Sequence, residues 1–425
     1  MKKELSGKNW LKPYENDAWT RWVPREELAP VFEQEITGDT IYLRIESNGN
    51  FNSYGKWICS TDNFPKDREL TFQVDYLAEQ VGFESVSIYA VLTWKDNQGN
   101  LLARDYVDER IQLEDGWKRL QRTIVPPDKS DCMTIELAFR WTEQGRVIWR
   151  NPSVFETNTL KSKRIVRVAT TSILSRHNPE ENVQAMLHYL DEAGRAGADI
   201  VCFTETFNSV WTDLEPEEVC QPIPGDLTRA LGAKAKEYNC YVVFSMYERD
   251  GMDIFNTAVL LDRNGNIAGK YYKVHLPLAE AEQGVTPGRE YKVFDTDFGR
   301  IGIIICWDQA FPDASRVVAE MGAEIIFIPT IGHEPIQAIA RAKDNGVYVV
   351  VSGMYGPESS MVIDPMGKVI ATVRTQNPDA KEGVCVVDID LAERHFTHWL
   401  SMGPCLCEPK HIYTNERRLD TYSYR

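Results

Sequence analysis

The sequence is short of positive charge, glycine-rich phosphate loops and long apolar runs, and each shortage excludes a class of protein. Its 47 lysines and arginines face 63 aspartates and glutamates, which gives a formal net charge of −16 over 425 residues. Nucleic acids and anionic membrane surfaces bind basic faces, so neither is expected as a partner. No apolar run approaches the ~18 residues of a membrane-spanning helix. Neither GxGxxG nor GxxxxGK(S/T) occurs, which removes the dinucleotide and P-loop signatures.

Histidines and paired cysteines are also scarce. The seven histidines are scattered, and the nine cysteines are odd in number, so we expect reduced thiols, a cytoplasmic location and no metal. Cys405 and Cys407 form the single tight pair, with His411 nearby, but a metal site would need a second pair. The first residues contain lysines without an apolar stretch behind them, so a secretory signal is not expected.

The residues that are present indicate a folded chain of two modules. Hydrophobic residues make up 43% of the sequence and aromatic residues 11%, which is typical of globular proteins. A length of 425 residues exceeds one ordinary core, so two domains are expected. Eight of the eleven tryptophans precede residue 150, whereas seven of the nine cysteines follow residue 200. The two halves therefore differ in character.

The first half alternates apolar and polar residues in short runs separated by turn signals. This pattern predicts an all-β, two-sheet antiparallel sandwich in a domain of residues 1–160. The predicted strands are 39–47, 70–76, 86–94, 117–125, 133–141 and 147–149.

This half loosely resembles the jelly-roll sandwiches of carbohydrate-binding modules. The matching features are GKW at 55–57, GW at 116–117 and NP at 151–152 after the last strand. The resemblance implies a glycan as a partner, because tryptophan rings stack on sugars. Tryptophans also fill sandwich cores, so a structural or docking role is the preferred reading.

The second half, residues 161–425, follows a polar linker at about 158–164 and changes to an α/β pattern. A helix is predicted to begin at Asn178, the N-cap, with Pro179 in its first turn. Further helices are expected at about 227–238, 313–321 and 335–345. Strands are expected at 165–170, 199–203, 241–245, 257–261, 267–271, 291–296, 301–306, 324–329, 347–352, 360–364, 369–373 and 383–388. Alternating strands and helices with paired hairpins predict an α/β domain.

Three residues at strand ends have side chains suited to nucleophilic chemistry. Cys306 closes an apolar strand before a turn, where α/β folds place reactive groups, although buried cysteines are commonly inert. Glu205 follows another buried strand, where partial burial would raise its basicity, although most glutamates are surface acids. Lys273 ends a hairpin strand and is suited to hold an oxyanion, although a solvated lysine is the common alternative.

Taken together, these positions resemble the nitrilase, or carbon–nitrogen hydrolase, superfamily. The signatures are FTETF at 203–207, YYKVHLP at 271–277 and IICWDQAFPD at 304–313. Supporting matches are TPG at 286–288, DFGRIG at 297–302, RAKDNGVYVV at 341–350 and SSMVIDPMG at 359–367. The resemblance spans about 163–395 and implies a four-layer αββα sandwich. It also implies a mechanism without metal or cofactor, in which Cys306 is the nucleophile and Glu205 the general base. Lys273 and the backbone N–H of Trp307 would hold the oxyanion.

The resemblance further implies a second glutamate that holds the lysine. Glu282 is preferred over Glu280 because it lies nearer the TPG turn. The cysteine signature and PTIGHEP at 329–335 resemble the branch of N-carbamoyl amidohydrolases, with departures at Ala310 and His333. We expect both residues to line the substrate pocket with Trp307. His275 belongs to the lysine signature, and a structural role is expected for it.

The expected function is thiol-dependent hydrolysis of non-peptide C–N bonds in linear amides or N-carbamoyl compounds. Two alternatives stay open: acyl transfer to an amine on the same fold, and a sugar- or surface-binding protein with an inert hydrolase half. The tail from about residue 399 is aromatic and polar, with Trp399, Tyr413, Tyr422 and Tyr424. Related tails bridge subunits, so a homodimer or larger assembly is expected.

Overall fold

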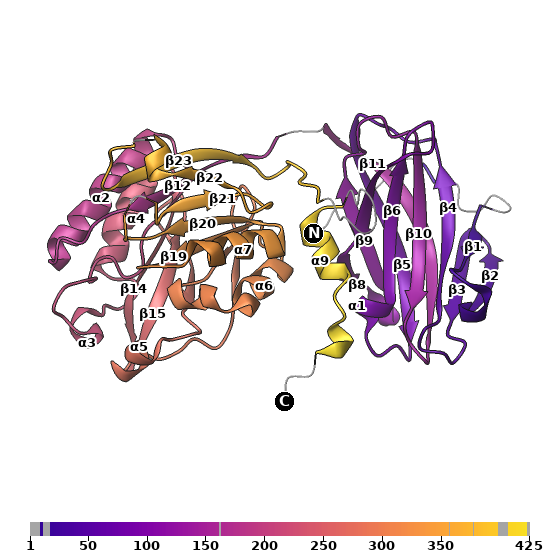
Figure 1. Ribbon diagram of the computed structural model, residues 1–425, viewed down its shortest axis with the longest axis horizontal. Coiled ribbons are helices and arrows are strands. Elements are labelled where there is room, and N and C mark those ends of the chain that lie inside the picture. Colours follow the sequence, from indigo (N-terminus) through magenta and orange to yellow (C-terminus); the bar gives the residue numbers. More distant parts are fainter. Residues whose placement is uncertain are drawn as a thin grey trace. The chain divides into compact units, whose positions relative to one another are not determined.

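The computed structural model describes residues 9–11, 18–160, 163–356, 358–376, 378–397 and 407–422, without the side chains of 158–160 and 376. The chain divides into two compact units (Figure 1). The first comprises Met1–Ser162 together with Phe396–Arg425, and the second comprises Lys163–His395. Within the described part, no helix is long and apolar enough to cross a membrane.

The first unit contains two antiparallel sheets. One has the order β1 (Thr20–Trp22), β4 (Tyr54–Thr61), β10 (Cys132–Arg140), β6 (Ile88–Lys95) and β7 (Leu101–Val107). The other has the order β2 (Val31–Thr37), β3 (Thr40–Glu46), β11 (Arg146–Leu160), β5 (Arg68–Glu79), β9 (Lys118–Ile124) and β8 (Glu109–Gln112). Short helices interrupt them at η1 (Glu26–Leu28), α1 (Glu84–Ser87) and η2 (Glu114–Gly116). The strand expected at 86–94 therefore begins only after α1.

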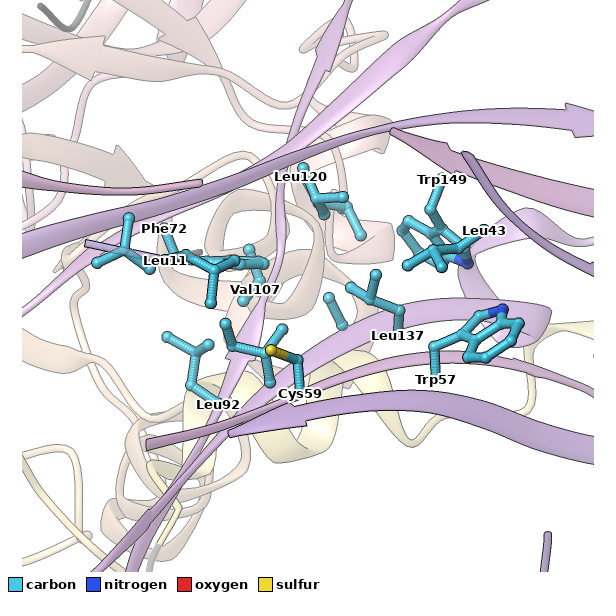
Figure 2. Close-up of a cluster of buried hydrophobic side chains, with 14 of the residues drawn as sticks. Leu11, Leu43, Trp57, Cys59, Phe72, Leu92, Val107, Leu120, Leu137 and Trp149 are labelled. Carbon is cyan, nitrogen blue, oxygen red and sulfur yellow. The ribbon is translucent and has the colours of Figure 1, made fainter. Parts of the chain in front are cut away.

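The core of the first unit lies between these sheets and contains four of its tryptophans. Figure 2 shows Trp57 and Trp149 from opposite sheets packed with Leu43 and Leu137. Trp19 and Trp94 are buried in the same cluster. These four rings fill the interior, where a sugar cannot reach them.

The described part of the C-terminal segment packs on the outer face of the first sheet. Cys407 and Ile412, the latter in α9 (Pro409–Asn415), form a buried cluster with Tyr89 and Tyr106. Because successive strand residues point to opposite faces, Tyr89 faces away from the core that contains its neighbour Ile88. This segment, which ends in η4 (Leu419–Thr421), is thus grouped with the first unit. That differs from the expected 161–425 division.

Polar contacts fix the same segment. Arg122 pairs with Glu408 at 2.8 Å, and the Tyr106 hydroxyl donates to Glu416 at 2.8 Å. Tyr413 packs at the edge of the apolar cluster, whereas Tyr422 is half exposed. Trp399, Tyr424 and Cys405, which the sequence singles out, lie outside the described residues.

The second unit contains two six-stranded sheets. The first has the order β16 (Ile267–Tyr272), β15 (Asp253–Leu261), β14 (Tyr241–Asp250), β13 (Ile200–Cys202), β12 (Ile165–Ser172) and β23 (Gly383–Asp390). The second has the order β17 (Val293–Asp295), β18 (Arg300–Ile303), β19 (Ile325–Pro329), β20 (Tyr348–Ser352), β21 (Met361–Ile363) and β22 (Val369–Thr372). The pairs β12–β13, β13–β14, β18–β19 and β19–β20 are parallel, and the remaining pairs are antiparallel.

The two sheets of this unit face each other, and helices cover their outer faces (Figure 1). Val243 and Phe327, one from each sheet, share the cluster between them. Helices α2 (Pro179–Arg195) and α4 (Asp226–Tyr238) pack on the first sheet, and α6 (Pro312–Glu320) and α7 (Pro335–Asn345) pack on the second. The predicted start of α2 is confirmed, because the Asn178 side chain accepts the Glu181 N–H at 3.0 Å. The shorter helices are α3 (Pro216–Val219), α5 (Leu278–Glu282), η3 (Cys306–Ala310) and α8 (Val373–Gln376).

Candidate active site

Glu205 lies three residues beyond the carboxyl end of the parallel strand β13 and is 3% exposed. The loop that carries it is held from both sides. The backbone N–H of Thr206 donates to Ser245 Oγ at 2.8 Å, and that of Ile331 donates to Glu205 Oε2 at 3.3 Å. The carboxylate is therefore fixed in the interior, with its second oxygen directed to other partners.

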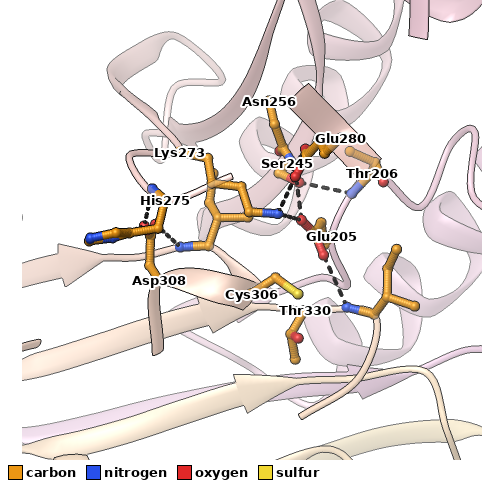
Figure 3. A network of polar contacts seen from close by, with 12 residues as sticks. Glu205, Thr206, Ser245, Asn256, Lys273, His275, Glu280, Cys306, Asp308 and Thr330 are labelled. Carbon is orange, nitrogen blue, oxygen red and sulfur yellow. Dashed lines mark hydrogen bonds and ion pairs between the residues drawn. The ribbon is translucent and has the colours of Figure 1, made fainter. Parts of the chain in front are cut away.

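Lys273 follows β16 and is 2% exposed, which is unusual for a lysine. Its Nζ contacts Glu205 Oε1 at 2.8 Å and Glu280 Oε2 at 2.6 Å (Figure 3). Burial acts against the ammonium charge. The charges of the Glu205 and Glu280 carboxylates outweigh it, so the pKa of Lys273 lies well above its usual range. The side chain is thus a permanent cation between two carboxylates.

The second glutamate at this site is Glu280, and the preference for Glu282 is wrong. Glu280 is 7% exposed and contacts Lys273, whereas Glu282 is exposed to solvent. Residues two apart on a helix lie on nearly opposite sides, so α5 can direct only one of them at the lysine. Burial, helped by the charge of Glu205, raises the pKa of Glu280 against the lowering effect of Lys273.

Cys306 occupies a strained turn after β18. Its backbone φ is +42°, a left-handed conformation that is uncommon outside glycine. The buried side chain of Asp308 fastens this turn by accepting the Ile305 N–H at 3.0 Å and the Tyr271 hydroxyl at 2.7 Å. Asp308 also accepts the backbone N–H of His275 at 2.8 Å and lies 3.0 Å from its Nδ1. His275 therefore has the structural setting expected from the sequence.

The Cys306 thiol is enclosed beside the charged cluster. Figure 3 places its sulfur on the side of Glu205 and next to Thr330. The sulfur lies 3.9 Å from the carbonyl of Gly332, which also accepts the Thr330 hydroxyl at 2.6 Å. Burial, followed by the charge of Glu205, raises the pKa of the thiol to about 12 despite the opposing charge of Lys273. At neutral pH the sulfur is protonated and needs a base before it can attack.

The three residues expected to line the pocket have different settings. Trp307 follows Cys306 directly, is 47% exposed and meets Phe311 edge to face. His333 is bound through Nε2 to the carbonyl of Ser359 at 2.8 Å, and burial lowers its pKa. Ala310 is half-buried, and its carbonyl accepts a guanidinium hydrogen bond at 3.3 Å. Contact of each with a substrate stays a prediction.

Sequence reasoning missed Asn256, which joins the two carboxylates. Its Nδ2 donates to Glu205 Oε1 at 2.9 Å and to Glu280 Oε1 at 2.8 Å, and the residue is 1% exposed. Carboxylate oxygens can only accept, so this amide is held in one orientation. The signal available in the sequence was a polar residue that interrupts the apolar run of β15.

Tyr247 is a second residue that the sequence did not reveal. It pairs with Asn256 across β14 and β15, so their side chains are neighbours on the face of the sheet that carries Ser245 and Glu205. Burial, and then the charges of the glutamates, raises the pKa of its phenol. The phenol is thus neutral and lies in the electrostatic field of the cluster.

The described part of the chain was searched for clusters of metal-ligating side chains. Among those residues, no group of three or more His, Cys, Asp or Glu side chains is arranged to hold an ion. The eight described cysteines are all free thiols.

Known proteins match the second unit. The profile of the carbon-nitrogen hydrolase family matches residues 166–398. The human protein omega-amidase NIT2 is 30% identical over 235 residues, which cover 50% of this chain and 83% of that protein. The citrullinase of Francisella tularensis is 34% identical over 194 residues, which cover 42% of this chain and 66% of that protein. Among solved structures, an amidase from Nesterenkonia sp. aligns with a TM-score of 0.47 and 24% identity, over 54% of this chain and 93% of that chain.

Proposed function

The chain belongs to the carbon–nitrogen hydrolase family, and from this premise we propose that it hydrolyses linear amides or N-carbamoyl compounds through a thioester on Cys306. One observation carries the proposal. A protonated thiol, a buried carboxylate and a permanent ammonium meet at the ends of three separate strands. These are the nucleophile, the base and the cation that acyl transfer requires.

In the first half-reaction, Glu205 removes the proton from Cys306 as the sulfur attacks the carbonyl carbon. The pKa of about 12 makes this base necessary, because little thiolate exists at neutral pH. The carbonyl π electrons move to oxygen, where Lys273 Nζ and the backbone N–H of Trp307 stabilise the charge. The C–N bond then breaks, and Glu205 returns the proton to the departing nitrogen, which leaves as ammonia or an amine.

In the second half-reaction, water attacks the thioester. Glu205, again a carboxylate, takes one proton from that water as the new C–O bond forms. The tetrahedral intermediate collapses, the C–S bond breaks, and the proton returns to sulfur. The products are an acid and the free thiol, so the reaction as written requires neither an oxidant nor a metal. An N-carbamoyl substrate yields a thiocarbamate and then a carbamic acid, which loses carbon dioxide.

Glu280 and Asn256 act as positioning residues. Asn256 donates to both carboxylates, and Glu280 fixes the Lys273 ammonium at 2.6 Å. Their arrangement keeps Glu205 Oε1 on the lysine while Oε2 is held by a backbone N–H. The Glu205 carboxylate therefore stays in one position through both half-reactions, which lowers the cost of reorienting it at each step.

The substrate class is drawn from two observations. One relative carries the name of an omega-amidase and another that of a citrullinase, an amide and a ureido chemistry respectively. Ala310 follows Cys306 by four residues, and we expect its small side chain to leave room for the substrate. Acyl transfer would follow the same path with an amine in place of water, so the products with and without an added amine separate the two reactions.

For the first unit we propose a structural or docking role. Its four buried tryptophans are unavailable for stacking on a sugar. The C-terminal segment covers the outer face of one of its sheets, which leaves less open surface there. A glycan array probed with the full chain tests this reading. Saturable binding of one glycan would contradict it.

Ammonia release from a panel of amides and ureido compounds tests the enzymatic proposal. Cys306→Ala and Cys306→Ser should both abolish release. Cys220→Ser is the matched control, because that thiol is also half-buried in the second unit and should be dispensable. Release that survives loss of Cys306 would refute the thioester route.

A further inference from the structure

Two exposed aromatic rings from separate loops of the second unit form a pair. Trp211 lies in the same loop as Glu205, between β13 and α3, and is 42% exposed, whereas Tyr355 follows β20 and is 64% exposed. Their ring centroids lie 5.6 Å apart at an interplanar angle of 58°. The mechanism above uses neither ring.

Gly332 connects this pair to the reacting sulfur. The ring of Tyr355 lies so close to Gly332 that a methyl group there would come within 2.6 Å of Tyr355 Cε2. The carbonyl of the same glycine is 3.9 Å from Cys306 Sγ. Gly332 therefore borders both the Tyr355 ring and the thiol.

The Trp211 loop is held in a conformation that costs energy. The backbone φ of Trp211 is +53°, which is rare for a bulky residue. Its carbonyl lies 2.8 Å from His177 Nδ1, and the preceding Val210 carbonyl accepts the Ser175 hydroxyl at 2.7 Å. The His177 ring stacks on the indole at 17° between planes. The surrounding contacts thus maintain an exposed indole in a strained place, a pattern found at ligand sites.

Two arginines that border the pair are already paired with glutamates, and the charged residue nearest to it in sequence, Asp213, is an exposed acid two residues after Trp211. Arg176, beside His177, pairs with Glu382 at 2.6 Å, and Arg374 pairs with Glu358 of the Tyr355 loop at 3.3 Å. Within the described residues, no cation lies over either ring, in contrast to Tyr241, which has Arg263 above it. A substrate tail that ends in a carboxylate would meet the exposed Asp213 and no uncommitted arginine here, whereas a flat apolar group can contact the exposed parts of both rings.

We propose that Trp211 and Tyr355 form the acyl-side subsite, which selects amides or N-carbamoyl compounds that carry an aromatic group on a short chain. This inference rests on the proposed function, because it assigns the substrate of the same thiol. Stacking on two rings should give roughly a tenfold preference for an aryl-terminated substrate over its truncated analogue.

The test compares 3-phenylpropionamide with propionamide. Tyr355→Ala and Trp211→Ala should each lower kcat/KM for the aryl amide by about three- to tenfold, through KM, because the contact is equal in the ground and transition states. Propionamide should change by less than about twofold, since it does not reach the rings. Met252→Ala, at a side chain 96% exposed, is the control and should leave both substrates unaffected.

Binding to the Cys306→Ala variant separates this inference from the proposed function. Calorimetry should show tighter binding of 3-phenylpropionamide than of propionamide, and the added Tyr355→Ala change should remove that difference. Equal binding of the two amides, or a stronger preference for an ammonium-terminated amide, would overturn the aromatic subsite. Selective aryl binding without ammonia release by the intact protein would leave the subsite standing and refute the hydrolase.

Discussion

Replacing Glu280 by glutamine tests the second glutamate of the site, for which the sequence favoured Glu282 and the structure has Glu280. The substitution keeps the shape of the side chain and removes one of the two carboxylates that hold Lys273. The Lys273 Nζ–Glu280 Oε2 distance is 2.6 Å, and the Asn256 amide donates to the other oxygen at 2.8 Å. Glutamine can still accept one of these bonds, so the loss concerns mainly charge.

The size of the expected effect depends on the carboxylate that still pairs with Lys273 in the variant. Leaving one partner of a buried ion pair uncompensated costs about 3–5 kcal/mol. Here Glu205 still contacts Lys273 at 2.8 Å. We therefore expect the free energy of unfolding to fall by about 1–3 kcal/mol. Activity should fall by roughly 10²-fold, as for loss of one electrostatic group in an active site.

Glu282→Gln is the matched control, two residues away on the same helix. Its side chain is exposed, so stability should change by less than about 0.5 kcal/mol and kcat/KM should be unchanged. Urea unfolding and steady-state kinetics measure both effects. Equal losses for the two variants, or loss at Glu282 alone, would refute the geometry.

Three further predictions concern the thiol, its turn and the C-terminal segment. Because the pKa of Cys306 is raised to about 12, its alkylation by iodoacetamide should rise about tenfold per pH unit up to pH 10; a plateau near pH 8.5 would contradict the burial argument. Asp308→Asn leaves backbone donors of the nucleophile turn with a weaker acceptor, so unfolding free energy should fall by about 1–3 kcal/mol and kcat should fall with it. A kcat that is unaffected would show that the turn does not position the sulfur. Ile412→Asp puts a charge into the buried cluster on the first unit, so limited proteolysis should release the C-terminal segment while the rest of the chain stays folded; resistance equal to wild type would contradict that packing.

The sequence predicted the fold best where local pattern and tertiary packing agree. Helix α2 has its predicted N-cap because Asn178 and Pro179 satisfy local requirements independent of the rest of the chain. In the first unit, strands β1, β2, β4, β7 and β8 were missed. In β7, the buried Asp105 interrupts the apolar pattern, and only the fold brings the Trp94 indole N–H to it at 2.7 Å.

Some residues of the candidate site could likewise be predicted from the sequence, and others could not. Glu205, Lys273 and Cys306 were singled out because each lies at a strand end, and the resemblance of their surrounding motifs to the family then assigned their roles. The sequence alone could not decide between Glu280 and Glu282, because the choice depends on which side of α5 faces Lys273. Asn256 and Tyr247 were missed for a related reason, since their proximity to the carboxylates comes from pairing between β14 and β15.

The central claim is a covalent acyl group on Cys306, and rapid-quench intact-protein mass spectrometry tests it most directly. After mixing with a hydrolysed amide, the chain should gain the mass of the acyl group within the first turnover. Peptide mapping should place that mass on Cys306, and it should be lost at a rate no slower than kcat. Turnover without any adduct, together with ammonia release by Cys306→Ala, would contradict the account.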